Sequence, residues 1–140
     1  DQLIEQKEGC SINSIFQKKS ENYFRKLENK LSLSELKKKN SVISLGGGAF
    51  LNRSIRKAVK VSAVSFWLDV NVEELILRLK KTKKRPLLFN KNLSETVNKI
   101  YLERKQTYNE SDFKINCNFL KPEKIAKKVL ELYEISRNKI

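Results

Sequence analysis

The residues best suited to chemistry are three glycines in succession, Gly46, Gly47 and Gly48, which follow the apolar segment 41–45. Glycine carries no Cβ atom, so backbone N–H groups in such a run can approach a ligand closely. A turn that needs one positive φ angle would require only one glycine. Three in succession therefore favour a binding role over a purely structural turn.

Arg25 is the second candidate, in the sequence Phe24-Arg25-Lys26-Leu27-Glu28. On a helix, residues three apart are neighbours, so Glu28 can orient the guanidinium and leave its remaining N–H groups for a carboxylate ligand. Taken alone, an ordinary surface ion pair is the simpler interpretation of this spacing.

Two further arginines lie in the second half of the chain. Arg85 precedes Pro86 in a basic stretch, and a loop of this kind can deliver a cation to a phosphoryl group when it closes. A solvated run of charges explains it equally well. Arg104, with Tyr108 one turn later, is a possible second anion contact, although a surface charge on a helix is the simpler interpretation.

The elements that must position these residues alternate between helices and short apolar strands. Helices are expected at 2–8 (ended by Gly9), after Ser11, at 20–38 as one helix or two, at 52–59, 71–80 and 94–108, and from Pro122 onward. Strands are expected at 41–45, 61–68 and 113–117, and a basic loop at 81–93. This alternation predicts an α/β fold with a mostly parallel sheet, in a single domain over 1–140.

The net charge of +14 first indicates nucleic-acid binding, because cations neutralise phosphates. However, the cations are 23 lysines against 7 arginines, and they are spread along the chain. Contacts to base edges and bidentate phosphate contacts favour arginine, whereas lysine-rich helix surfaces are usually solvated. We therefore expect no nucleic-acid partner, and a basic nucleic-acid-binding domain stays an alternative.

Several classes of protein are excluded by what the sequence lacks. No apolar run approaches the ~20 residues of a membrane-spanning helix, so no membrane partner is expected. The chain has no histidine and only two cysteines, Cys10 and Cys117, which excludes zinc sites of the usual kinds and Ser-His or Cys-His catalysis. With no secretory pattern at the N-terminus, a reducing cytoplasm is the expected compartment.

An ordered set of motifs resembles the shikimate kinase family along essentially the whole chain. The matching motifs are Asp1-x-x-Ile4-Glu5, Gly9-x-Ser11-Ile12-x-x-Ile15-Phe16, Glu21-x-x-Phe24-Arg25-x-x-Glu28, the segment 42–49 with its three glycines, Arg78, Arg85-Pro86-Leu87-Leu88 and Arg104-x-x-x-Tyr108. Each motif is weak alone, but their order and spacing are highly specific.

The resemblance implies a three-layer α/β/α fold with a parallel sheet of the P-loop kinase type, a substrate-binding helical region at 2–40 and a lid loop at 80–93. It implies transfer of the γ-phosphate of ATP, with Mg²⁺, to the 3-hydroxyl of shikimate, in aromatic amino-acid biosynthesis. We expect a monomer with shikimate and ATP as its small-molecule partners.

By the same resemblance, Asp1 would hold shikimate hydroxyls, and Arg25 and Arg104 would clamp the shikimate carboxylate. Gly46, Gly47 and Gly48 would meet both shikimate and the phosphate region. Arg85 would act on the transferred phosphate, so Asp1 and Arg85 are the catalytic candidates. On the nucleotide side, Arg78 and the stretch before Pro122 would contact adenine. No residue of this chain is assigned as a metal ligand.

The chain departs from the family at one important place. The Gly-x-x-Gly-x-Gly-Lys-[Ser/Thr] loop that cradles phosphates is absent from these 140 residues, as is the first Asp of the family's Asp-x-Asp motif. The expectation is a domain of this fold without its first strand or strands and P-loop, about 30 residues in extent. The isolated chain is therefore expected to be inactive. A non-catalytic binding module and a related gluconate-type kinase are the alternatives.

Overall fold

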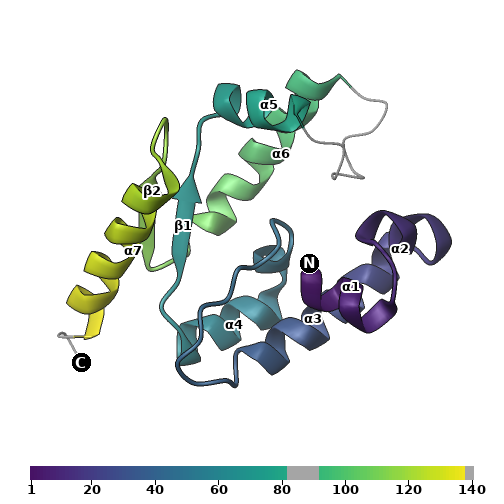
Figure 1. Cartoon of the computed structure of the whole chain (residues 1–140), viewed down its shortest axis with the longest axis horizontal. Coiled ribbons are helices and arrows are strands. Elements are labelled where there is room, and N and C mark those ends of the chain that lie inside the picture. Colours follow the sequence, from purple (N-terminus) through teal and green to yellow (C-terminus); the bar gives the residue numbers. More distant parts are fainter. Residues whose placement is uncertain (82–91, 138–140) are drawn as a thin grey trace. The chain divides into compact units, whose positions relative to one another are not determined.

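The computed structural model describes residues 1–81 and 92–137. It divides into two compact units, the first over Asp1–Ala63 and the second over the described residues from Val64 onward. The two units are treated separately below, and Figure 1 gives the order of their helices and strands.

The first unit opens with three helices whose boundaries follow from capping residues. These are α1 (Gln2–Glu8), α2 (Ile12–Lys18) and α3 (Glu21–Glu35). Gly9 ends α1 with φ 65°, a left-handed conformation that glycine adopts without a Cβ penalty. The Ser11 hydroxyl accepts the N–H of Ser14, and the Ser20 hydroxyl accepts that of Tyr23. The expected helix starts at Ser11 and Ser20 are confirmed.

The three helices share one apolar core, formed by Ile4, Ile15, Phe24 and Leu27, one or more from each helix. Ile15 is completely buried, and the rings of Phe16 and Phe24 lie 4.9 Å apart. The segment 20–38 holds one long helix rather than two. The helix runs through the second candidate start at Ser34 to Glu35, and its apolar face is continuous there, because Leu31 packs on this core and both Leu33 and Leu36 pack on the next.

The segment 41–45 forms no strand and, within the described residues, pairs with none, so the expected buried strand is wrong here. Its side chains do alternate in burial: Ile43 and Leu45 are half-buried against a second core, whereas Val42 is fully exposed. A strand needs hydrogen bonds to a neighbouring backbone, and side-chain alternation alone does not supply them.

A 3₁₀ turn, η1 (Ala49–Leu51), and α4 (Arg53–Ser62) complete the first unit. The Asn52 side chain caps α4 by accepting the N–H groups of Ser54 and Ile55. Leu36, Ala49, Ile55 and Val59 form the second core between these segments. The helix α4 runs to Ser62, so the strand expected at 61–68 begins later than its apolar pattern indicates.

The second unit contains β1 (Phe66–Asp69), α5 (Val72–Lys80), α6 (Leu93–Tyr108), β2 (Phe113–Asn116) and α7 (Pro122–Arg137). The strands β1 and β2 are parallel and lie side by side, with Phe66 opposite Phe113 and Asp69 opposite Asn116 (Figure 1). They are the only strands within the described ranges.

The core of the second unit forms where β1 and β2 end. Val70, Ile115 and Cys117 are buried there, with Leu75 of α5 and Ile125, Val129 and Leu132 of α7 packed against them. Pro122 is the first residue of α7, where its missing N–H costs no helical hydrogen bond. No helix among residues 1–81 and 92–137 is both long and apolar enough to cross a membrane.

Candidate functional site

Arg25 is held on α3 between two carboxylates of the same helix. Its Nη1 donates to Oε2 of Glu28 across 2.8 Å, and its Nε and Nη2 both donate to Oε1 of Glu21, at 3.3 Å and 3.2 Å. Glu28 is only 6% exposed, so this ion pair is partly shielded from water. A guanidinium has five N–H groups, and within the described residues these three bonds leave donors for an incoming ligand.

The glycine turn packs directly against this ion pair. A Cβ atom on Gly48 would lie 2.7 Å from Cζ and 2.8 Å from Nη2 of Arg25, closer than real Cβ atoms come to other atoms. A Cβ on Gly46 would lie 3.0 Å from Oε1 of Glu28 and 3.4 Å from Oδ1 of Asp1. The glycines therefore let the backbone of this turn approach the side chains of α3.

Close approach, and not an unusual turn, is what requires glycine here. Ala49 N donates to Gly46 O across 2.9 Å and closes the turn, but none of Gly46, Gly47 and Gly48 has a positive φ; only Gly9 among the glycines does. The structural alternative of a turn needing a left-handed residue does not hold for this run. A side chain at Gly46 or Gly48 would collide with the neighbouring side chains of Glu28 or Arg25.

Asp1 lies at the start of α1, next to the glycine turn. Its carbonyl accepts the N–H groups of Ile4 and Glu5, at 2.9 Å and 3.0 Å, which fixes the backbone of the first turn of the helix. Its side chain makes no capping hydrogen bond to α1. A hollow of about 60 Å³ lies beside it and is lined in part by Asp1, Glu28, Ser44 and Gly46.

The first unit thus brings together the carboxylate of Asp1, the guanidinium of Arg25 and the backbone of the glycine turn. Such a set can bind a small polyhydroxylated acid: the guanidinium takes a carboxylate and Asp1 accepts hydrogen bonds from hydroxyl groups. Among the described residues, no group of three or more His, Cys, Asp or Glu side chains comes together.

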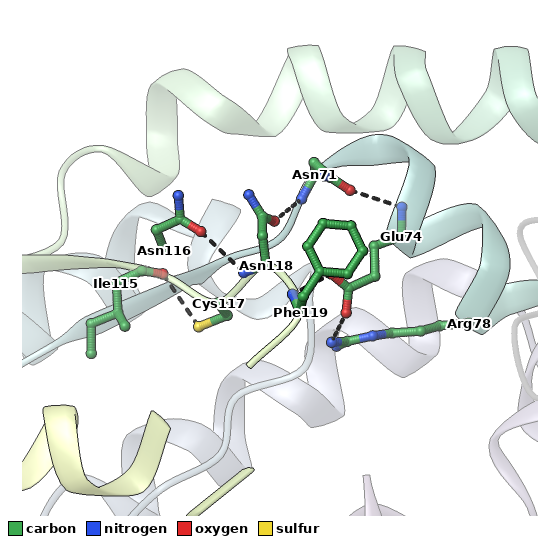
Figure 2. A network of polar contacts seen from close by, with 8 residues as sticks. All are labelled: Asn71, Glu74, Arg78, Ile115, Asn116, Cys117, Asn118 and Phe119. Atoms are coloured by element: carbon green, nitrogen blue, oxygen red, sulfur yellow. Dashed lines mark hydrogen bonds and ion pairs between the residues drawn. The ribbon is translucent and has the colours of Figure 1, made fainter. Parts of the chain in front are cut away.

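Arg78 lies on α5 in the second unit and is paired with Glu74 one turn earlier. The other oxygen of Glu74, Oε2, accepts the backbone N–H of Phe119 across 2.9 Å (Figure 2). This hydrogen bond is the main reason why the pKa of the Glu74 carboxyl is lowered; burial opposes the shift and Arg78 adds to it. Glu74 therefore stays ionised at neutral pH.

Arg104 lies on α6 in the second unit and is half-buried. The same helix carries Tyr108, whose ring meets Trp67 of β1 edge-on at 5.8 Å, and Tyr101, whose hydroxyl donates to Asp69 at 3.0 Å. Burial, more than the neighbouring Asp69, raises the pKa of Tyr101. These contacts fix α6 against the end of β1, so the backbone that carries Arg104 is well anchored.

The structure brings together part of the set predicted from sequence. Asp1, Arg25, Gly46 and Gly48 meet in the first unit, with Gly47 completing their turn. Arg78, Arg104 and Pro122 lie in the second unit, and the clamp predicted for Arg25 and Arg104 stays a prediction. Arg85 and Pro86 lie outside the described residues.

Two contacts of the candidate site residues were missed by the sequence analysis. Glu21 binds Arg25 in addition to Glu28, and the spacing of four residues on a helix was a sufficient signal for it. The bond from Phe119 to Glu74 joins residues 45 positions apart, and no local pattern indicates it.

Known proteins of one family match this chain along most of its length. The family model described as shikimate kinase matches residues 1–134. A shikimate kinase of Sulfurihydrogenibium sp. is 36% identical over 130 residues, which cover 93% of this chain and 77% of that protein. A shikimate kinase of Bartonella henselae is 35% identical over 93% of this chain and 62% of its own length.

The solved structures that match this chain belong to the same family as these relatives. Shikimate kinase from Acinetobacter baumannii in complex with shikimate matches with a TM-score of 0.92 and 30% identity, covering all of this chain and 78% of that one. The enzyme from Aquifex aeolicus matches with a TM-score of 0.82 and 34% identity, over 96% of this chain and 78% of that one. The expected three-layer α/β/α fold of the P-loop kinase type is confirmed. The chain belongs to the shikimate kinase family.

Proposed function

We propose that this protein acts in the transfer of the γ-phosphate of ATP to the 3-hydroxyl of shikimate. The observation that carries the proposal is the Arg25 guanidinium, fixed by buried Glu28 and packed on Gly48, with Asp1 beside the same glycine turn. Membership of the shikimate kinase family and the likeness to an enzyme solved with shikimate support the same substrate.

In this proposal each candidate substrate-binding residue has a distinct role. Arg25 binds the shikimate carboxylate, with Arg104 as its second cation. Asp1 accepts hydrogen bonds from ring hydroxyls and orients the attacking one, and Gly46 to Gly48 leave room for the ring. Binding shikimate in one orientation lowers the barrier, because the hydroxyl no longer has to find the phosphoryl group by diffusion.

The reaction itself is a direct displacement. The 3-hydroxyl oxygen forms a bond to the γ-phosphorus, the bond from that phosphorus to the β,γ-bridging oxygen breaks, and ADP leaves with the bridging oxygen. The proton of the hydroxyl is released to solvent. Arg85 would stabilise the charge that spreads over the transferred group. Mg²⁺ is expected to be bound together with the phosphates of ATP.

Shikimate binding to the 140-residue chain tests the proposal by isothermal titration calorimetry. We expect binding of shikimate and much weaker binding of its methyl ester, which retains the ring and hydroxyls but carries no carboxylate charge. Arg25→Ala should weaken shikimate binding by about tenfold or more, because a charge-assisted hydrogen bond contributes roughly 1.5–3 kcal/mol. The methyl ester should bind the wild-type chain and Arg25→Ala equally.

Arg53→Ala is the matched control, since Arg53 is an exposed arginine of the same unit at the start of α4. It should bind shikimate as the wild-type chain does. Equal shikimate affinity of the wild-type and Arg25→Ala chains would overturn the assigned role. Preference for gluconate over shikimate would favour the related gluconate-type kinase.

A coupled assay of ADP release tests the activity of the chain by itself. We propose that these 140 residues do not turn over shikimate and ATP at a useful rate, because they contain no P-loop sequence to neutralise the β- and γ-phosphates. Turnover within the usual kinase range, roughly 1–100 per second, would contradict this. Shikimate binding without turnover is equally expected of a non-catalytic module, and an in-frame Gly-Lys-[Ser/Thr] loop encoded upstream would identify an enzyme.

A further inference from the structure

Arg56 binds the backbone that directly follows the glycine turn. Its Nη1 donates to the carbonyl oxygen of Phe50 at 3.0 Å and to that of Leu51 at 2.7 Å. These two carbonyls end η1, a single 3₁₀ turn of three residues. Carbonyl groups at the end of a helical turn have no partner within it, so a cation there satisfies them and complements their dipoles. Arg56 therefore fixes the end of η1 to α4, the helix from which its side chain extends.

The glycine turn and η1 are one short, continuous piece of backbone. Ala49 N donates to Gly46 O at 2.9 Å, and Leu51 N donates to Gly48 O at 3.2 Å. Ala49 between them is 1% exposed, with its methyl group in the second core. Because each of these hydrogen bonds spans only three residues, a displacement of the end of η1 also displaces Gly48.

The helix α4 is held against α3 by a polar and an apolar contact. Ser54 Oγ lies 2.8 Å from Oδ1 of Asn29 on α3. Ile55 is completely buried in the core on which Leu33 of α3 also packs. Arg56 thus extends to η1 from a helix that is fixed to the one carrying Arg25.

We propose that Arg56 is a positioning residue for shikimate binding, which holds the glycine turn against the guanidinium of Arg25. This rests on the proposed function and adds a residue that acts through the turn. A Cβ atom at Gly48 would lie 2.7 Å from Cζ of Arg25, so the turn and the guanidinium are already in contact. The turn is one support of that guanidinium and the ion pair with Glu28 is another. Since a bidentate hydrogen bond to a carboxylate depends on the orientation of the guanidinium, loss of one support weakens the bond.

The first test compares ¹H–¹⁵N spectra of the free 140-residue chain and two variants, Arg56→Ala and Arg53→Ala. Arg53 is an exposed arginine of the same helix, so its replacement removes the same charge without the contacts to η1. We expect Arg56→Ala to shift the amide signal of Gly48 and the Nε–H signal of Arg25, and Arg53→Ala to leave both in place. Unmoved signals in Arg56→Ala would overturn the proposal.

The second test measures the dissociation constants for shikimate and its methyl ester by calorimetry. Arg56→Ala should raise that for shikimate about five- to tenfold, the effect of a lost hydrogen bond, and Arg53→Ala should leave it unchanged. Arg56→Lys should restore part of the affinity, because an ammonium group can donate to the same carbonyls. The ester lacks the carboxylate charge that Arg25 binds, so its affinity should stay the same in all variants. Equal losses for shikimate and the ester would show that Arg56 only stabilises the fold.

A double-mutant cycle separates the role of Arg56 from a direct contact with the substrate. If Arg56 acts through Arg25, adding Arg56→Ala to Arg25→Ala should cause no further loss of shikimate affinity. Additive losses would overturn the proposal.

Failure of the proposed function would give a different result. The wild-type chain would then not bind shikimate, or Arg25→Ala would bind it equally well, while Arg56→Ala would still shift the signals of Gly48 and Arg25 in the free chain.

Discussion

Gly48 lies so close to Arg25 that a Cβ atom at Gly48 would sit 2.7 Å from Cζ of the guanidinium. The contact joins the turn before η1 to the middle of α3, residues 23 positions apart in the sequence. Because Nη1 of Arg25 is already bound to Glu28 at 2.8 Å, a shift of the guanidinium away from Gly48 would disturb that ion pair. The position of Arg25 therefore depends both on the glycine at position 48 and on the ion pair with Glu28.

Replacing Gly48 with alanine should displace the guanidinium of Arg25. We expect Gly48→Ala to raise the dissociation constant for shikimate by roughly 10- to 100-fold, the loss of a charge-assisted hydrogen bond. Calorimetric titration of the 140-residue chain measures this. Gly9→Ala is the contrasting variant, because a Cβ atom at Gly9 meets nothing within 4 Å but the φ angle there is 65°. This variant should lower the free energy of unfolding by about 1 kcal/mol and leave the affinity for shikimate unchanged. Normal shikimate binding by Gly48→Ala would contradict the packing argument.

Glu28 should matter to Arg25 more than Glu21 does. Glu28 is 6% exposed, whereas the side chain of Glu21 is 50% exposed and its ion pair is screened by water. We expect Glu28→Ala to weaken shikimate binding about tenfold, Glu28→Gln to restore part of it through its amide oxygen, and Glu21→Ala to have a smaller effect. Equal losses in Glu28→Ala and Glu21→Ala, measured by the same titration, would show that burial of the carboxylate is unimportant.

The contact between Glu8, Lys19 and Tyr23 should make the stability of the first unit depend on pH at both ends of the range. Lys19 Nζ lies 2.6 Å from Glu8 Oε2, and the Tyr23 hydroxyl donates to the same carboxylate at 3.1 Å. The hydrogen bond from Lys19 is the main cause that lowers the pKa of Glu8 below its ordinary 4.5, and Glu8 is the main cause that raises the pKa of Lys19 above 10.5.

The direction of the effect follows from linkage. A lowered carboxyl pKa stabilises the fold above pH 4.5, and this is lost as pH falls through the folded-state value; a raised amine pKa stabilises it below 10.5, and this is lost as pH rises. In thermal unfolding followed by circular dichroism, the melting temperatures of Glu8→Gln and the wild type should differ most between pH 4.5 and pH 10.5. Outside this range the two melting temperatures should converge. A constant difference from pH 3 to pH 11 would refute this.

Cys117 should be the slower of the two cysteines to react. It is 1% exposed, and burial raises the pKa of its thiol, so little thiolate is present near neutral pH. Cys10 is only partly buried. With iodoacetamide at pH 8, mass spectrometry should detect carbamidomethylated Cys10 first and modified Cys117 only after unfolding in guanidinium chloride. Modification of Cys117 in Cys10→Ser at the rate of a free thiol would show that its burial is transient.

The capping residues of the first unit are predictable from the sequence, because each cap depends on atoms no more than four residues away. Gly9 ends α1, Ser11 begins α2 and Ser20 begins α3 at the expected places. The order of the short motifs was also sufficient to indicate the family, since a motif such as Phe24-Arg25-x-x-Glu28 is read along a single helix. These are local properties of the chain.

Other features depend on segments that are distant in sequence, and only the tertiary structure decided them. The alternation of 41–45 fits a strand, yet it forms none in the described part of the chain, because pairing needs a neighbouring backbone. Three glycines indicated a site, but the packing of Gly48 on Arg25 and of Gly46 on Glu28 explains why glycine is required. The link from Phe119 to Glu74 spans 45 positions, so no helical or strand period could reveal it. The sequence by itself determined helix ends, motif order and family, because these depend on neighbouring residues; the tertiary structure determined which side chains meet, because that depends on packing between elements.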